Sequence, residues 1–216
     1  MEKISSGSTD NMDVDKDFSK IDGVKEGLYQ YYEIEGTTDY FSLNTGRVMK
    51  KIGVNEKNEY HEKVKVTFVI VDNKPHLNEQ GIDYMCNWGE KLILVTTNKK
   101  HIAFSLKKEY ENLDILYYDK LDLNKMLEDL SEKYDVKRLT IQSGGNLNGL
   151  FMRENLIDYV NVVIAPLLIG GKDVSTLVDG ESITNEKELN KLRALELIEC
   201  NKLNNSYIQL KYKVIK

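Results

Sequence analysis

Apolar and polar residues alternate along this chain with two different periods. Five runs rich in β-branched residues predict strands, because strands bury such side chains. Between the third and fourth runs, Leu123, Leu127 and Leu130 fall on one face of a helix expected at 121–134, with charged residues opposite. Shorter helices are expected at 27–34 and 147–156. The predicted strands are 64–71, 92–96, 113–117, 138–142 and 160–165.

The fold class follows from this alternation of strands with helices. It predicts an α/β fold with a mostly parallel central sheet flanked by helices on both faces. Residues 160–171 are apolar on both sides, which is typical of a central strand. Two strand-like runs near the C-terminus, 195–200 and 206–215, flank a loop that contains Asn-Asn. We expect them to form an antiparallel hairpin appended to the sheet, and the alternation along 207–214 predicts one buried and one exposed face.

The N-terminal segment differs from the rest of the chain. Its first part is polar, acidic and rich in Ser and Asp, and it shows little periodicity. Such a composition predicts an irregular or mobile segment. We therefore expect an irregular segment at 1–26 and one folded domain at 27–216, which is long enough to bury a core.

The composition of the chain argues against several classes of protein. The formal net charge of −5 argues against a nucleic-acid partner. No apolar run approaches the roughly 18 residues of a membrane span, and no signal peptide is recognisable, so we expect a cytoplasmic protein. The two cysteines are far apart, and the three histidines have no metal-binding spacing, so we expect no metal site. These residues are Cys86, Cys200, His61, His76 and His101.

The stretch TIQSGGNLNGLFM (140–152) places two adjacent glycines between a predicted strand and a predicted helix. One interpretation is structural: Gly144 and Gly145 supply positive φ to a turn, and Ser143 or Asn146 caps the helix. The other is chemical: bare backbone N–H groups at a helix N-terminus suit a pyrophosphate. The run lacks the GxGxxG spacing of a Rossmann unit, so a dinucleotide would bind on a different fold.

Two further loops carry groups that suit a phosphate. SLNTGRVMKKIG (42–53) holds a glycine and an arginine before a basic segment. LILVTTNKKH (92–101) is an apolar run that ends in two hydroxyls, an amide and two lysines. Each loop alone is explained as a solvated loop. Because open α/β sheets bind ligands at the carboxyl ends of their strands, the loops together favour a phosphate-containing ligand.

The sequence resembles a known family most clearly from 138 to 171, RLTIQSGGNLNGLFMRENLIDYVNVVIAPLLIGG. This block is similar to the strand, Gly-Gly turn, helix and P-x-L-x-G-G loop of the riboflavin-biosynthesis reductase domain, within the dihydrofolate-reductase-like superfamily. The resemblance implies that NADPH lies across the strand ends. The residues it implies as cofactor contacts are Gly46, Arg47, Val48, Thr96, Thr97, Asn98, Lys99, Ser143, Gly144, Gly145, Asn146 and Leu147.

The same resemblance implies a reaction and an assembly. Family members transfer hydride to an imine or carbonyl carbon of a small heterocycle, here most simply a 5-amino-6-(5-phosphoribosylamino)uracil-like substrate. Such reductases commonly dimerise through the region that corresponds to 160–171, so we expect a homodimer with two-fold symmetry. Tyr32 and Glu33 are candidates for the proton donor, and solvent is the alternative donor.

The chain departs from the family at three places. Residues 2–11, EKISSGSTDN, resemble only the tail of the family's first element, so its strand is either truncated or replaced by another segment. Ser143 stands where the family usually has Glu, and Met49 where it usually has Thr. Two alternatives therefore stay open: a non-catalytic nucleotide-binding remnant of the fold, and a reductase of pterins or xenobiotic carbonyls.

Overall fold

The computed structural model describes residues 3–37, 40–59 and 62–216 and divides the chain into two units. The parallel-sheet unit contains the described residues of Asp39–Ser143. The hairpin unit contains the described residues of Met1–Thr38 and Gly144–Lys216. Each unit has its own sheet, and the two are described separately below.

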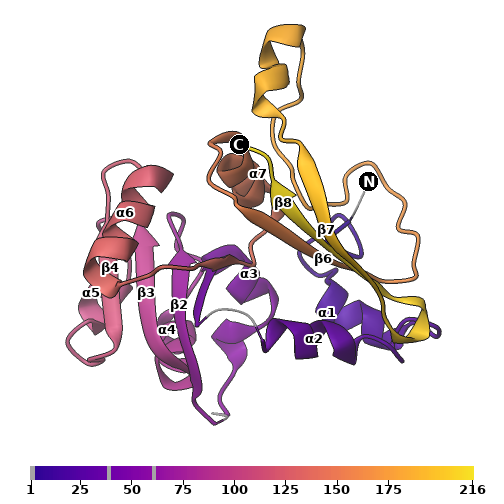
Figure 1. Ribbon diagram of the computed structural model, residues 1–216. Helices are drawn as coiled ribbons and strands as arrows, with labels where there is room; N and C mark the ends of the chain where they lie inside the picture. Colours follow the sequence, from indigo (N-terminus) through magenta and orange to yellow (C-terminus); the bar gives the residue numbers. More distant parts are fainter. Residues whose placement is uncertain (1–2, 38–39, 60–61) are drawn as a thin grey trace. The chain divides into compact units, whose positions relative to one another are not determined.

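The parallel-sheet unit is built on five strands (Figure 1). They are β1 (Phe41–Thr45), β2 (Val64–Val71), β3 (Gly89–Thr96), β4 (Leu113–Tyr117) and β5 (Thr140–Ile141). Their order across the sheet is β4-β3-β2-β1-β5, and every neighbouring pair is parallel. The parallel sheet expected from the sequence is confirmed.

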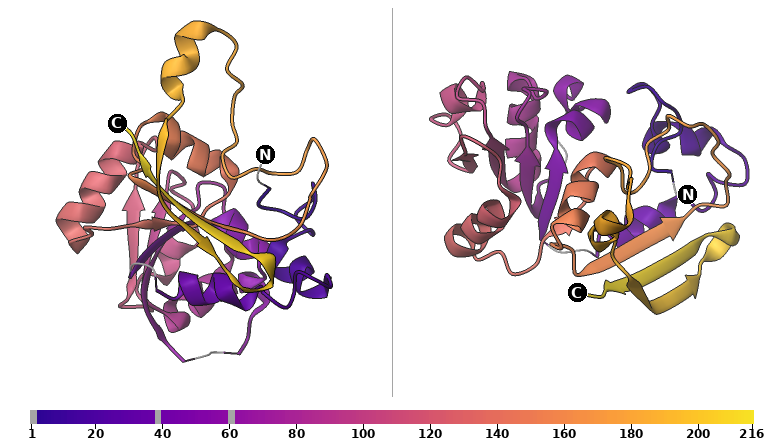
Figure 2. Two further views of the ribbon diagram at one scale, coloured as in Figure 1. Left: turned by 45° about the vertical axis from the view of Figure 1, so that its right-hand side comes forward. Right: turned by 90° about the horizontal axis from the view of Figure 1, so that it is seen from above.

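Helices cover both faces of this sheet. Phe68 and Leu92 point to one face, where they pack in a core with Ile82 and Met85 of α4 (Glu79–Trp88). Because strand side chains alternate, the buried Val69 and its neighbours point to the other face, and α6 lies on that side (Figure 2). The remaining helices of the unit are α3 (Gly46–Lys51), the 3-10 turn η2 (Val54–Glu56) and α5 (Ala103–Leu106), and α6 spans Leu123–Tyr134.

The hairpin unit contains a second, separate sheet. It consists of β6 (Tyr159–Ile164), β8 (Ile208–Val214) and β7 (Leu195–Lys202), in that order and antiparallel throughout. The hairpin is therefore not appended to the parallel sheet, as the sequence had suggested, but pairs with β6. β6 is an edge strand among the described residues and not a central one. The other elements are α1 (Val14–Asp17), η1 (Phe18–Lys20), α2 (Tyr29–Glu35), α7 (Gly145–Arg153), η3 (Glu186–Lys191) and η4 (Asn204–Ser206).

The predicted burial of alternate positions along β8 is wrong in detail. Gln209 is buried, whereas Ile208 is 39% exposed. The amide of Gln209 is satisfied on both sides, because its Nε2 donates to Asn161 Oδ1 at 3.1 Å and its Oε1 accepts from Asn201 Nδ2 at 3.1 Å. A fully hydrogen-bonded amide tolerates burial. Burial along β8 therefore does not follow the alternation of apolar and polar residues.

The N-terminal segment contains more structure than the sequence predicted. The side chain of Asp13 caps α1 by accepting from the N–H of Asp15 at 3.0 Å. Phe18 is buried in a small core with Val24 and Tyr207. These apolar anchors explain why a polar, aperiodic segment still packs. None of the helices within 3–37, 40–59 and 62–216 is long and apolar enough to cross a bilayer.

Candidate functional site at the carboxyl edge of the parallel sheet

A buried carboxylate, Asp72, lies directly after β2. It accepts the backbone N–H groups of His76, at 3.0 and 3.1 Å, and of Leu77, at 3.0 Å. The imidazoles of His76 and His101 reach it at 2.9 Å and 3.1 Å. Because Nδ1 of His101 accepts from the Ala103 N–H, its Nε2 carries the proton and donates to Asp72. Burial raises the pKa of Asp72, but hydrogen bonds, led by that from His101, outweigh it and lower the pKa overall.

The start of α3 is packed against this carboxylate. A Cβ added to Gly46 would overlap the side chain of Asp72, so the close approach requires glycine. Thr45 caps the helix by accepting from the N–H of Val48 at 3.3 Å. Arg47 is exposed at this helix start. Asp72 therefore fixes the turn after β1 as well as the turn after β2.

The loop after β3 is tied to the same residue. The side chain of Thr96 is fully buried, its hydroxyl donates to the backbone oxygen of Asp72 at 2.8 Å, and it accepts from the N–H of Asn98 at 3.1 Å. Asn98 in turn accepts from the N–H of Lys100 at 2.9 Å. The Thr96 hydroxyl therefore holds the loop in place. Thr97 is half-buried in this loop, and Lys99 is exposed.

These loops meet at one edge of the sheet. β1 and β3 lie on either side of β2, so their carboxyl ends are two strand spacings, or roughly 10 Å, apart. β5 pairs with β1, which brings Ser143 to the same edge as Arg47 and Lys99. The edge therefore gathers a hydroxyl and two cations from three predicted loops.

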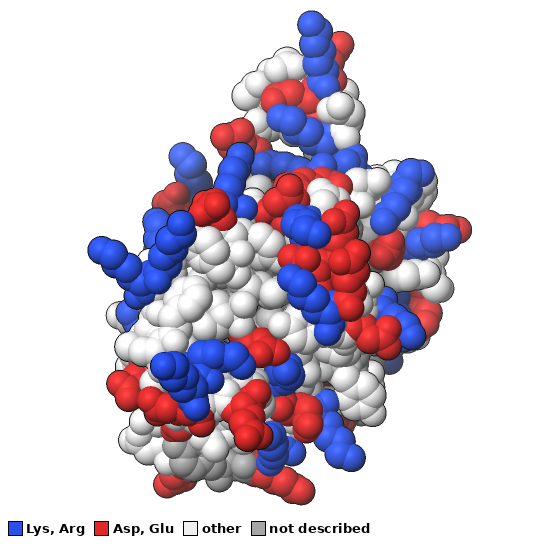
Figure 3. Space-filling view, turned by 90° about the vertical axis from the view of Figure 1, so that its left-hand side faces the viewer, with Lys and Arg blue, Asp and Glu red and all other residues white. Residues whose placement is uncertain are grey.

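Charge around this unit is mixed. On the face shown in Figure 3, basic and acidic side chains are interspersed around an uncharged area. Recognition of a phosphate on such a surface depends on individual side chains such as Arg47 and Lys99 and not on a broad basic field.

The glycine pair at the start of α7 does not have the backbone conformation that its turn position predicted. Gly144 is the N-cap residue with φ −71° and ψ 160°, and neither Gly144 nor Gly145 has a positive φ. The N-cap residue of α7 is itself a glycine, so it contributes no side-chain hydrogen bond to the helix. The expectation that these glycines supply a positive φ is therefore wrong.

Close packing explains one glycine of the pair. A Cβ on Gly145 would overlap the carbonyl oxygen of Thr176 and the carboxylate of Asp179, and a Cβ on Gly149 would overlap the backbone of Asp179. Gly145 and Gly149 are four residues apart, so they share one helix face. The N–H of Asp179 also donates to the Gly145 oxygen at 2.9 Å. By contrast, a Cβ on Gly144 would meet no atom within 4 Å.

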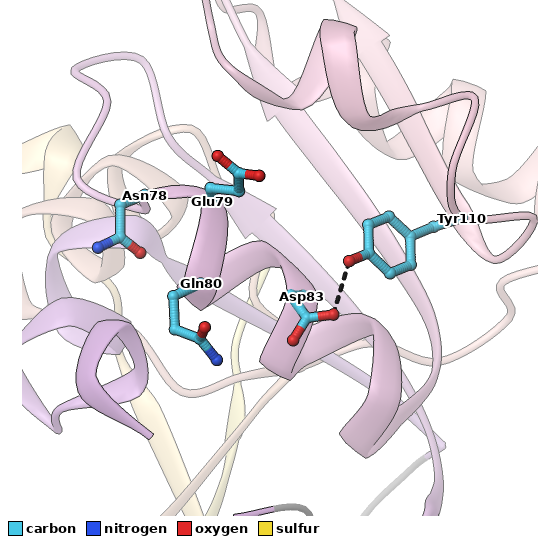
Figure 4. Close-up of a pocket in the computed structure, with 5 residues that line it drawn as sticks. All are labelled: Asn78, Glu79, Gln80, Asp83 and Tyr110. Carbon is cyan, nitrogen blue, oxygen red and sulfur yellow. Dashed lines mark hydrogen bonds between the residues drawn. The ribbon is translucent and has the colours of Figure 1, made fainter. Parts of the chain in front are cut away.

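A hollow of about 420 Å³ lies at the start of α4 in the parallel-sheet unit (Figure 4). Asp83 accepts a hydrogen bond there from the Tyr110 hydroxyl at 2.6 Å. The hollow is lined by Glu79 as well as Asp83, and these acids oppose a phosphate.

A hollow of about 750 Å³ lies beside α7 in the hairpin unit. Asn146 from the first turn lines it together with Lys3, Arg153 and Lys172. The acids Asp173, Asp179 and Glu181 line it as well. Asn146 thus lines a cavity within its own unit, and Leu147 is buried.

The candidate proton donors lie on α2. Tyr32 and Glu33 are both exposed, and the Tyr32 hydroxyl donates to Asp15 at 2.7 Å. Partial burial, followed by the contact with Asp15, raises the pKa of Tyr32. A tyrosine that holds its proton more tightly is a weaker acid.

Sequence reasoning missed Asp72 and excluded its histidines only as metal ligands. His101 is buried and caps the start of α5. An acid directly after an apolar strand, with two histidines in the loops that follow, was the available signal. Among the described residues no group of three or more His, Cys, Asp or Glu could hold a metal ion, and His61 lies outside them.

The chain is similar to several known proteins. The family model described as the RibD C-terminal domain matches residues 38–208. The 2,5-diamino-6-ribosylamino-4(3H)-pyrimidinone 5′-phosphate reductase of Archaeoglobus fulgidus is 30% identical over 88 residues, 41% of this chain and 40% of that protein. The protein of the same name from Methanothermobacter thermautotrophicus is 42% identical over 64 residues, 30% of this chain and 29% of that protein.

A solved structure shares the fold. Acinetobacter baumannii RibD superposes with a TM-score of 0.66 at 16% identity, over 88% of this chain and 50% of that one. The matches thus span less than two thirds of each of these three proteins. The family match extends from before β1 to the first residue of β8 and includes every expected cofactor residue. This chain belongs to the RibD C-terminal domain family.

Proposed function

We propose that this chain is an NADPH-dependent reductase of riboflavin biosynthesis. The observation that carries the proposal is the edge at which the loops after β1, β3 and β5 meet, inside the segment that the family model matches. Two relatives of the chain are named as pyrimidinone phosphate reductases. The assignment of an oxidoreductase, and of its cofactor, rests on these two observations together.

The residues present fit a dinucleotide. Around Gly144 there is open space at the start of α7, where the first N–H groups of a helix lack partners within the helix. Arg47 and Lys99 offer positive charge at the edge of the parallel sheet. We therefore propose Gly144, Gly145, Asn146 and Leu147 for the pyrophosphate, with Ser143 adjacent. Thr97, Asn98 and Lys99 are proposed for the adenosine ribose and its 2′-phosphate.

The chemistry demands little of the protein side chains. When bound, the cofactor supplies a hydride to an imine or carbonyl carbon of the substrate. The loops bind and orient the two molecules and exclude water. Tyr32 and Glu33 precede the matched segment, and the raised pKa of Tyr32 disfavours proton transfer from it. Solvent is therefore the proton donor we favour.

The substrate class is taken from the names of the relatives. We propose a ribosylamino-pyrimidine 5′-phosphate, either the 2,5-diamino pyrimidinone named for the relatives or its deaminated uracil counterpart. Ser143 and Met49 replace the carboxylate and the hydroxyl usual in the family.

The test is consumption of NADPH by the purified chain. Both pyrimidine phosphates, a pterin and a simple aromatic carbonyl serve as oxidants, and the loss of NADPH absorbance is followed with each. Turnover with one of the pyrimidines, and none with the pterin or carbonyl, supports the proposal. Turnover only with the pterin or carbonyl contradicts it. Nucleotide binding without turnover of any of these oxidants would favour the alternative, a non-catalytic nucleotide-binding remnant of the fold.

Assembly and location belong to the same proposal. The face of the hairpin-unit sheet that carries Val160, Leu197 and Tyr212 is apolar, and Leu197 is 53% exposed. We propose that a second copy of the chain covers this face, because a two-fold axis would bring the same apolar strands together. A cytoplasmic location fits two free cysteines, Cys86 and Cys200.

A further inference from the structure

Lys99 and Asp119 meet beyond the ends of two adjacent strands. β3 pairs with β4 in parallel, with Thr96 opposite Tyr117, so the loops that follow lie side by side. Lys99 Nζ lies 3.3 Å from Asp119 Oδ1. We propose that Asp119 is a specificity-determining residue that limits the preference for a 2′-phosphorylated coenzyme by competing for Lys99. This inference rests on the proposed function.

The carboxylate is fixed by a second contact. The Tyr117 hydroxyl donates to Asp119 Oδ1 at 2.6 Å, and Lys99 Nζ lies 5.3 Å from the centroid of the Tyr117 ring. These hydrogen bonds, first that from Tyr117 and then that from Lys99, lower the pKa of Asp119. The carboxylate is therefore charged at neutral pH and held beside the lysine, although both side chains are largely exposed.

The two charges favour different coenzymes. A 2′-phosphate that pairs with Lys99 approaches the like charge of Asp119 and displaces an existing partner. A ribose without that phosphate offers hydroxyl donors, and dinucleotide sites for NAD use an acidic residue to accept them. Lys99 therefore favours NADPH, and Asp119 favours NADH. Because the pair is exposed, its effect is about two- to fivefold in affinity.

Calorimetric titration with two fragments of the coenzyme isolates this effect. 2′,5′-ADP carries the 2′-phosphate, and 5′-ADP lacks it. Asp119→Asn should tighten binding of 2′,5′-ADP about two- to fivefold and leave 5′-ADP unchanged or weaker. Asp135→Asn is the matched control, because Asp135 is equally exposed and pairs with Lys137 at 3.4 Å. It should change neither affinity.

A double-mutant cycle tests whether Asp119 acts on coenzyme affinity through Lys99. In a Lys99→Ala background, Asp119→Asn should no longer alter the ratio of the two affinities. An unchanged ratio in Asp119→Asn itself, a change that persists without Lys99, or an equal change in Asp135→Asn would each overturn the inference. If the unaltered chain binds neither fragment, nor NADPH, the cofactor assignment itself fails and this inference fails with it. That result differs from an unchanged ratio of the two affinities in Asp119→Asn, which removes the inference alone.

Discussion

His101 donates a hydrogen bond from Nε2 to the carboxylate of Asp72, 29 residues before it in the chain, at 3.1 Å. Both side chains are completely buried. The contact ties the loop after β3 to the loop after β2, and Asp72 in turn lies against Gly46 at the start of α3. One buried carboxylate therefore sets the relative positions of two loops that we assign to the coenzyme.

Loss of this contact should destabilise the parallel-sheet unit. His101→Phe removes a donor to Asp72 and leaves the Ala103 N–H without its acceptor. We expect a cost of about 1–3 kcal/mol in the free energy of unfolding, measured by urea denaturation. His76→Gln is the control and should cost less, because the His76 side chain is 30% exposed and water can replace it. Equal losses in both variants would contradict this assignment.

The lowered pKa of Asp72 predicts how stability changes in acid. A carboxyl group with a pKa lower in the folded than in the unfolded state stabilises the fold fully above its ordinary value of 3.8, and loses that contribution as pH falls through the folded value. Urea midpoints measured below pH 3.8 should therefore decline more steeply in the unaltered protein than in Asp72→Asn. Parallel declines would show that Asp72 does not contribute to acid unfolding.

The two adjacent glycines should respond differently to alanine. Gly145→Ala places a methyl group against Thr176 and Asp179, so it should lower the stability of the hairpin unit by about 1–3 kcal/mol. Gly144→Ala has open space around it and an ordinary φ, so stability should hold. If the pyrophosphate lies over Gly144, its alanine variant should instead weaken NADPH and NADH alike. A stable Gly144→Ala chain with unchanged binding of both coenzymes would exclude that position for the pyrophosphate.

The assembly proposal has a direct solution test. Light scattering at micromolar concentration should give the mass of two chains. Leu197→Lys should give the mass of one, because a lysine on the apolar sheet face would be desolvated in the dimer. Leu189→Lys is the matched control, since Leu189 is also 53% exposed but lies on η3. A one-chain mass for the unaltered protein would refute the dimer.

The regular elements of the parallel-sheet unit were predictable because the spacing of their apolar residues follows the strand or helix period closely. β2 spans Val64–Val71 as the sequence predicted, and α6 begins two residues inside its predicted start. β1 was missed because FSLNT mixes apolar and polar residues. Its Ser42 is nonetheless buried, with the hydroxyl donating to Gln142 Oε1 at 2.7 Å. Such pairings over long distances in sequence leave no local pattern.

The site was predictable as a set of loops but not in its internal contacts. The positions of Lys99 after a strand and of Gly144 before a helix follow from the sequence pattern. That Thr96 faces inward, or that a carboxylate from β2 lies against Gly46, depends on how neighbouring strands pair. The separate antiparallel sheet was missed for the same reason, because alternation along β8 does not say which strand lies beside it.

Coenzyme titration tests the central claim most directly. Calorimetry of the purified chain should show NADPH bound about tenfold or more tightly than NADH, since charge-assisted hydrogen bonds to the 2′-phosphate add to a shared pyrophosphate site. Added salt should reduce the preference, because exposed charges are screened. Replacing Thr97 and Lys99 together by Ala should remove the preference and leave NADH binding little changed. Binding of neither coenzyme at millimolar concentration would contradict the account.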